Sequence, residues 1–156
     1  MPSAYIDALK MLARRELSEA QVRQRLARRA HGEAEIEAAV ARLKEERAID
    51  DARVAGAIAR SEVTRKRGRL RASRQIQSAG IAAAVAKGAV DGAFEAIDDE
   101  ALIEAALAKR LRGRERAADD REWQRLYRYL LGQGFEAERV AKAMRRRRPV
   151  NARPEE

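Results

Sequence analysis

Two glycine pairs, Gly80-Ile81 and Gly134-Phe135, constrain the fold of this chain more than any other feature. They lie 54 positions apart, and each separates a basic amphipathic stretch from a short alanine-rich one. Glycine after a helix can adopt the left-handed conformation that ends the helix, while the apolar residue beside it packs back onto that helix. A helix–glycine–apolar–helix unit that recurs in this way predicts a row of stacked helical modules.

The composition predicts an all-α protein with thin cores. Of the 156 residues, 46% are hydrophobic but only 4% are aromatic, and alanine supplies much of the apolar count. Such sequence favours helices, and its small side chains each bury little area. The chain has no cysteine, which excludes disulfides and thiolate metal sites. No apolar run approaches the about 20 residues that span a bilayer, and no signal-peptide core is visible, so we expect a soluble cytoplasmic protein.

Cap signals and apolar spacing divide the chain into three units of three helices. Asp50-Asp51 and Asp98-Asp99 each offer an N-terminal cap to a helix that opens a unit. A unit of about 45–50 residues is marginally stable alone, so neighbouring units should stack. The expected bounds are 1–48, 49–97 and 98–146 for the three repeats and 147–156 for a flexible tail.

Basic residues gather in the middle of a chain whose net charge is +9. Seven cations fall within fifteen positions that contain one acid, Glu62, and Gly68 interrupts the helical pattern among them. The cluster consists of Arg60, Arg65, Lys66, Arg67, Arg69, Arg71 and Arg74. Arginines that converge from two helix ends can bind phosphates or carboxylates, so we expect a partner- or nucleic-acid-binding surface here; the alternative is a solvated helix face. A second run, Arg145–Arg148, is expected to be a non-specific basic tail.

The aromatic residues near the C-terminus admit two interpretations. Trp123, Tyr127 and Phe135 could stack on nucleic-acid bases. Their helical spacing alongside two leucines favours a buried apolar stripe instead. Tyr129 lies off that stripe, and we expect it to be a surface contact.

No set of side chains supports catalysis. His31 is the only histidine and lies beside Gly32 at a helix end, where a structural role is favoured over general-base work. Neither of the glycine-rich nucleotide-binding motifs is present. The adjacent aspartates point about 100° apart on a helix, which favours capping over a metal site or an acid–base dyad. We therefore expect no enzymatic activity, no cofactor and no bound metal.

Several segments, taken in order, resemble the signature of the RecX family. Ile49–Arg53, followed by a basic helix, Gly68 and a helix that ends at Ala79–Ile81, is similar to the core motif of that family. Arg14–Ser18 resembles its opening motif, and Tyr129–Phe135 resembles its closing motif. Each motif alone is weak, but their order and spacing together are fairly specific.

The resemblance extends from about Tyr5 to Met144, with three departures from the family pattern. Val22 and Val54 stand where leucine and phenylalanine are usual, which exchanges core volume. Gln133 stands where a basic residue usually precedes Gly-Phe, so this chain lacks the cation of the family pattern at that position.

The resemblance implies a regulator of the RecA recombinase, folded as three tandem three-helix repeats in an elongated, curved array. Members of the family act on the RecA–single-stranded DNA filament during recombination, DNA repair and the SOS response. They lie in its groove and restrain its ATP hydrolysis, strand exchange and growth. This implies the RecA filament as the partner of a monomeric protein, with direct contact to single-stranded DNA left open and no membrane partner. Charge alone supports an alternative, a stand-alone helical module that binds nucleic acid.

Overall fold

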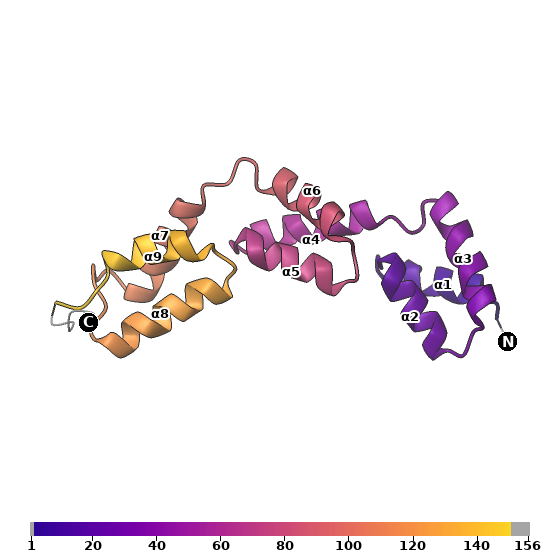
Figure 1. The fold of residues 1–156 in the computed structure, drawn as a ribbon, viewed down its shortest axis with the longest axis horizontal. Helices are drawn as coiled ribbons and strands as arrows, with labels where there is room; N and C mark the ends of the chain where they lie inside the picture. Colours follow the sequence, from indigo (N-terminus) through magenta and orange to yellow (C-terminus); the bar gives the residue numbers. More distant parts are fainter. Residues whose placement is uncertain (1, 151–156) are drawn as a thin grey trace. The chain divides into compact units, whose positions relative to one another are not determined.

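The structure, a computed structural model, describes residues 2–150 and contains helices and their connecting turns (Figure 1). The helices are α1 (Ala4–Arg14), α2 (Glu19–Arg28), α3 (Glu33–Glu45), α4 (Asp51–Thr64), α5 (Arg69–Ser78), α6 (Ala83–Ala93), α7 (Asp99–Leu111), α8 (Asp120–Gly132) and α9 (Ala137–Arg145). No strand is present over this range, so the predicted all-α fold class is confirmed. None of these helices is long and apolar enough to cross a membrane, among the residues that the structure describes.

The chain divides into two compact units. The first comprises the residues up to Arg60 together with Ser73–Ala93, and the second comprises Ser61–Ala72 together with the residues from Phe94 onward. Helices α4 and α5 therefore contribute residues to both units. The repeat bounds expected from the sequence stay predictions.

In the first unit, α1, α2 and α3 pack on one another. Burial in α3 follows the spacing of an amphipathic helix, because Ile36, Ala39, Val40 and Leu43 all lie inside. Ser18 begins α2 with the predicted capping box: its hydroxyl accepts the N–H of Gln21 at 3.1 Å, and the Gln21 side chain accepts the N–H of Ser18 at 3.0 Å. The buried apolar side chains are Ala4, Ala8, Met11, Leu17, Val22, Leu26, Ile36, Ala39, Val40, Leu43 and Ile49.

In the second unit, α7, α8 and α9 pack around the aromatic stripe of α8. Phe135 is 2% exposed, and Trp123 packs against the same core. The indole N–H of Trp123 donates to the carbonyl of Met144 at 2.9 Å, and the ring of Tyr127 lies 5.3 Å from that of Trp123. Phe135 therefore belongs to the core, and Trp123 and Tyr127 pack against it while partly buried, which agrees with the predicted apolar stripe.

The turn that ends α5 lies against the start of α2, within the first unit. Gly80 has a φ of +78°, the left-handed conformation expected for it. A Cβ at Gly80 would clash with the side chain of Ala20, and the hydroxyl of Ser18 donates to the carbonyl of Ala79. Glycine at position 80 therefore allows the left-handed turn that ends α5 and lets this turn lie close to the start of α2.

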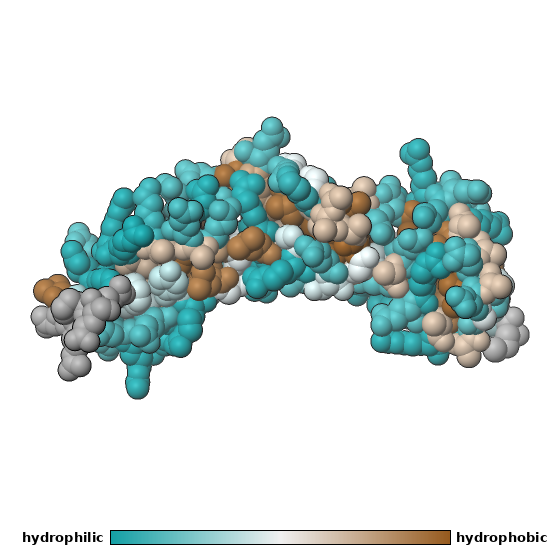
Figure 2. Space-filling model, in the orientation of Figure 1, coloured by the Kyte–Doolittle hydropathy of each residue, from teal (hydrophilic) through white to brown (hydrophobic). Residues whose placement is uncertain are grey.

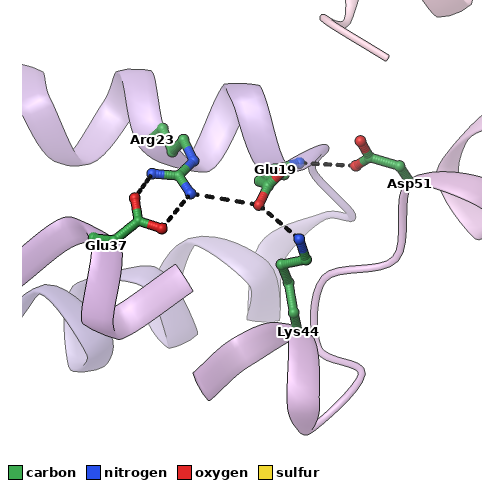
Figure 3. A network of polar contacts seen from close by, with 5 residues as sticks. All are labelled: Glu19, Arg23, Glu37, Lys44 and Asp51. Carbon is green, nitrogen blue, oxygen red and sulfur yellow. Dashed lines mark hydrogen bonds and ion pairs between the residues drawn. The ribbon is translucent and has the colours of Figure 1, made fainter. Parts of the chain in front are cut away.

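Asp51 fixes the start of α4 to the start of α2 (Figure 3). Its Oδ1 accepts the backbone N–H of Glu19 at 2.9 Å. The carboxylate of Glu19 lies 3.2 Å from Nζ of Lys44 and 3.5 Å from Nη2 of Arg23. Arg23 in turn makes two hydrogen bonds to Glu37, at 2.6 and 3.2 Å.

The turn that ends α8 lies against the start of α5 in an equivalent arrangement, within the second unit. Gly134 has a φ of +91°. The N–H of Gly68 donates to the carbonyl of Gln133 at 2.8 Å, and the N–H of Leu70 donates to that of Gly134 at 3.0 Å. Free carbonyls at one helix end thereby satisfy free amides at the start of another. A Cβ at Gly68 would clash with the Gly134 carbonyl, and one at Gly134 would clash with Arg71.

Each Asp-Asp pair divides its two carboxylates between two helices. Asp50 and Asp98 each accept a backbone N–H three residues on, at 3.1 Å, which confirms the predicted caps. Asp51 and Asp99 instead contact the start of an earlier helix, through a backbone N–H in the first unit and through Arg69 in the second. In each pair, the first aspartate therefore caps its own helix, and the second joins the start of that helix to the start of an earlier one.

Residues 147–149, just beyond α9, are packed against the second unit, although the sequence predicts a flexible tail from residue 147. Arg147 pairs with Glu104, and its carbonyl accepts the N–H of Ala117 at 2.9 Å. Pro149 is buried. The loop before α8 exposes polar backbone groups that this segment satisfies, which is why it is held. The rest of the expected tail, residues 151–156, lies outside the described residues.

Candidate basic interface

The seven cations of the predicted cluster lie in different settings. Arg60 and Arg74 belong to the first unit, and the other five belong to the second. Both Arg60 and Arg74 are exposed. Charged and polar side chains cover most of the face shown in Figure 2, so exposure alone does not distinguish a binding residue.

Arg67 and Arg71 share a buried carboxylate. Glu62 is 5% exposed; its Oε1 lies 3.5 Å from Nη1 of Arg67, and its Oε2 lies 3.5 Å from Nε of Arg71. Arg71 also donates to the carbonyl of Gly132 at 3.2 Å. A buried carboxylate without a cation would be costly, so these two arginines stabilise the fold.

Arg69 likewise pairs with a buried carboxylate of the second unit, that of Asp99. Its Nε donates to Oδ2 of Asp99 at 3.0 Å, and Asp99 is 7% exposed. Its Nη2 donates to the carbonyl of Phe94 at 2.8 Å, and its guanidinium lies 5.2 Å from the centre of the Phe94 ring. Arg69 therefore joins the start of α5 to that of α7.

Arg65 and Lys66 are the cluster members of the second unit that face solvent. They follow α4 in a turn where Lys66 has a φ of +59° and its N–H donates to the carbonyl of Val63 at 2.9 Å. Both side chains are exposed, and neither makes an ion pair or hydrogen bond to any residue between 2 and 150. They are therefore available to a partner.

A second basic surface, outside the predicted cluster, lies between α7 and α8. It is a hollow of about 470 Å³. Its lining consists of Ala106, Lys109, Arg110, Arg112, Glu122, Arg125, Leu126 and Tyr129. The guanidinium of Arg110 lies 3.3 Å from the centre of the Tyr129 ring, and that ring is half-buried. The sequence signals for this surface are the basic end of α7 before Gly113 and Tyr129, which the sequence predicts to be a surface contact.

His31 is committed to the first core. Its Nε2 lies 2.7 Å from Oδ2 of Asp7, its Nδ1 lies 3.5 Å from Oε2 of Glu35, and its side chain is 6% exposed. Over residues 2–150, no group of three acidic or histidine side chains, this one included, is arranged to hold a metal ion. The geometry therefore points to binding surfaces and to a structural histidine.

These features define an all-helical protein of three-helix modules whose junctions use glycine turns and buried ion pairs. Family models describe RecX domains of this kind: the first three-helix domain matches residues 4–43, and the third matches residues 98–144. The regulatory protein RecX of Chromohalobacter salexigens is 36% identical over 138 residues, which cover 88% of either chain. The chain belongs to the RecX family, as the resemblance in its motifs predicts.

Two solved structures share this fold. The crystal structure of RecX from Lactobacillus salivarius has a TM-score of 0.69 and 19% identity, and the match covers 91% of this chain and 92% of that one. A crystal structure of regulatory protein RecX also has a TM-score of 0.69, with 20% identity over 91% of this chain and 70% of that one. At these identities, the likeness shows the fold alone.

Proposed function

We propose that this chain is a cytoplasmic regulatory protein that binds the RecA–single-stranded DNA filament. It restrains the ATPase, strand exchange and growth of the filament in recombination, DNA repair and the SOS response. The observation that carries the proposal is RecX family membership over nearly the whole chain. The protein acts as a monomer and by contact, without a catalytic step or a cofactor.

The exposed cations support a filament-binding surface. Arg65 and Lys66 are uncommitted and held in a turn of defined backbone conformation, so they can meet an acidic surface without first breaking an ion pair. Arg60 and Arg74 are exposed candidates in the first unit. Arg67, Arg69 and Arg71 support the surface indirectly, because they hold the segment that carries it.

Inhibition requires only that the chain bind one state of the filament better than another. A protein that favours one conformation of a cycling assembly slows the cycle by the difference in its affinity for the two states. A net charge of +9 also speeds the encounter with a polyanionic filament. No side chain need touch the bound nucleotide.

ATP hydrolysis by preassembled RecA filaments on single-stranded DNA tests the proposal. Chain added well below the concentration of recombinase and of DNA binding sites should lower the steady-state rate, so that sequestration of DNA cannot explain the loss. An unchanged rate at every ratio up to equimolar would overturn the proposal. Tight binding to single-stranded DNA together with that unchanged rate would favour the stand-alone nucleic-acid-binding module.

A further inference from the structure

The hollow between α7 and α8 carries charge that its own surroundings do not neutralise. Four exposed cations line it, and none forms an ion pair within the described part of the chain. The four are Lys109, Arg110, Arg112 and Arg125. The one acid in the lining, Glu122, is already bound by Arg114 at 2.9 Å and accepts the N–H of Ala118 at 3.3 Å. The hydrogen bond from Arg114 lowers the pKa of Glu122, which therefore stays ionised and paired.

Stabilisation of the C-terminal end of α7 explains the positions of only some of these four cations. Lys109 and Arg110 lie in the last turn of α7, where cations stabilise the helix through its dipole. Arg125 lies on the neighbouring helix α8, and Arg112 follows α7 in a left-handed conformation with a φ of +51°. Cations brought together from two helices repel one another, and a bound anion relieves that repulsion.

Arg110 and Tyr129 add a flat surface to the same hollow. The guanidinium lies 3.3 Å from the ring centre, while Arg110 itself remains exposed. Bases of single-stranded nucleic acids stack on guanidinium planes and aromatic rings, whereas the carboxylates of an acidic peptide have no such face. A volume of about 470 Å³ lies within the range of small-ligand sites, so a nucleotide can enter.

We propose that this hollow is a direct contact site for single-stranded nucleic acid. Arg112 and Arg125 bind backbone phosphates, and Arg110, supported by Tyr129, stacks on a base. The inference deepens the proposed function and rests on it for its biological setting. Its test needs no recombinase, so either can fail while the other stands.

The test is fluorescence anisotropy of a labelled oligothymidylate of about 12 nucleotides, titrated with the chain alone over a range of salt concentrations. The wild type should bind, and its affinity should fall as salt rises. Arg112→Ser combined with Arg125→Ser should weaken binding about tenfold and reduce the salt slope by about 1–2. These residues are exposed, so the melting temperature should stay unchanged.

A matched variant controls for the loss of charge. Arg139→Ser combined with Lys142→Ser removes the same charge from exposed positions on α9 of the same unit. Neither cation lines the hollow, and both are paired with Glu100, at 3.9 and 3.8 Å, so this control should change the affinity by no more than about twofold. An equal loss in both double variants, or no binding by the wild type, would overturn the proposal.

A charge-conserving substitution separates nucleic acid from an acidic peptide. Arg110→Lys keeps the cation but removes the stacking plane, so it should weaken oligothymidylate binding about threefold or more. Polyglutamate should compete poorly for the wild type at equal charge concentration. Unchanged affinity of Arg110→Lys, or competition by polyglutamate as effective as that by unlabelled oligothymidylate, would assign the hollow to acidic peptide and contradict the inference.

Discussion

Glycine is required at position 134 for two separate reasons. The left-handed φ of +91° strains any residue with a Cβ, and a Cβ at this point would also clash with Arg71. Gly113 has a similar φ of +85° but no atom near the position of a Cβ. A comparison of substitutions at Gly113 and Gly134 therefore separates the effect of backbone strain from the effect of the close contact with Arg71 of α5.

Gly134→Ala should destabilise the chain more than Gly113→Ala. We expect Gly113→Ala to cost about 1 kcal/mol from strain alone. Gly134→Ala should cost about 2–4 kcal/mol, because overpacking adds to the strain. Urea denaturation of both variants measures the difference, and equal losses would contradict the junction at Gly134.

His31 and Asp7 make the stability of the first unit depend on pH. The hydrogen bond to Asp7 raises the pKa of His31, with further help from the nearby carboxylate of Glu35. The hydrogen bond from His31, together with the positive charges of Arg29 and Lys10, lowers the pKa of Asp7. The contribution of protonated His31 is fully present below its ordinary pKa of 6.5 and is lost as pH rises through the raised value. The contribution of Asp7 is present above its ordinary pKa of 3.8 and is lost as pH falls through the lowered value.

The wild type should therefore melt at a lower temperature as pH rises from about 6 to about 9. His31→Gln removes the titrating group and should flatten this dependence, with most of its destabilisation visible at the acidic end of the range. Thermal unfolding followed by circular dichroism at several pH values measures it. Parallel curves for the two proteins would show that His31 makes no such contribution.

At the scale of helices, the two units share one type of helix contact. An aspartate at the start of one helix binds the start of an earlier helix, but its partner differs between the units. In the first unit, Asp51 reaches the backbone N–H of Glu19 at the start of α2. In the second, Asp99 reaches the side chain of Arg69 at the start of α5. Both junctions place a glycine turn beside the same helix start, so the repeated motifs and the repeated aspartates serve one purpose.

Arg69→Met should destabilise the fold, whereas Arg65→Met should not. Removing Arg69 leaves the buried carboxylate of Asp99 without its cation, and we expect a loss of about 1–3 kcal/mol. Arg65 is exposed and unpaired within the described residues, so the same substitution there should change stability by no more than about 0.5 kcal/mol. Chemical denaturation compares them, and similar stabilities would contradict the structural role of Arg69.

Local sequence signals predict helix ends well in this chain. The capping box at Ser18 and the left-handed glycines at 80 and 134 all follow from neighbouring residues, and the structure confirms them. The partners of Asp99 and Glu62 could not be predicted, because nothing local shows which cation faces a buried carboxylate. The cluster around Gly68 therefore looked uniform in sequence, although three of its arginines stabilise the fold.

The hollow between α7 and α8 was missed for a related reason. Lys109, Arg110 and Arg112 belong to a basic run that continues to Arg116, but Arg125 lies beyond the following loop, so the sequence does not show that these cations meet. Tyr129 could be predicted as a surface contact because it lies off the apolar stripe. Its stacking with Arg110 depends on how α7 and α8 pack, which periodicity does not specify.

At the scale of the whole molecule, the basic residues divide into two groups with different tasks. Some, such as Arg69 and Arg71, neutralise buried acids and hold the junctions. Others, such as Arg65, Lys66 and the cations of the hollow, are exposed and unpaired within the described chain. The count of 34 basic residues therefore overstates the number of cations available to a partner.

Regulation of a RecA filament through exposed, unpaired cations can be measured in one experiment. The most direct measurement is ATP hydrolysis by preassembled RecA filaments against increasing concentrations of the chain. We expect inhibition by sub-stoichiometric wild type. The Arg65→Ser, Lys66→Ser double variant should need about tenfold more protein for the same inhibition, with its melting temperature unchanged. No inhibition by the wild type, or equal inhibition by the double variant, would contradict it.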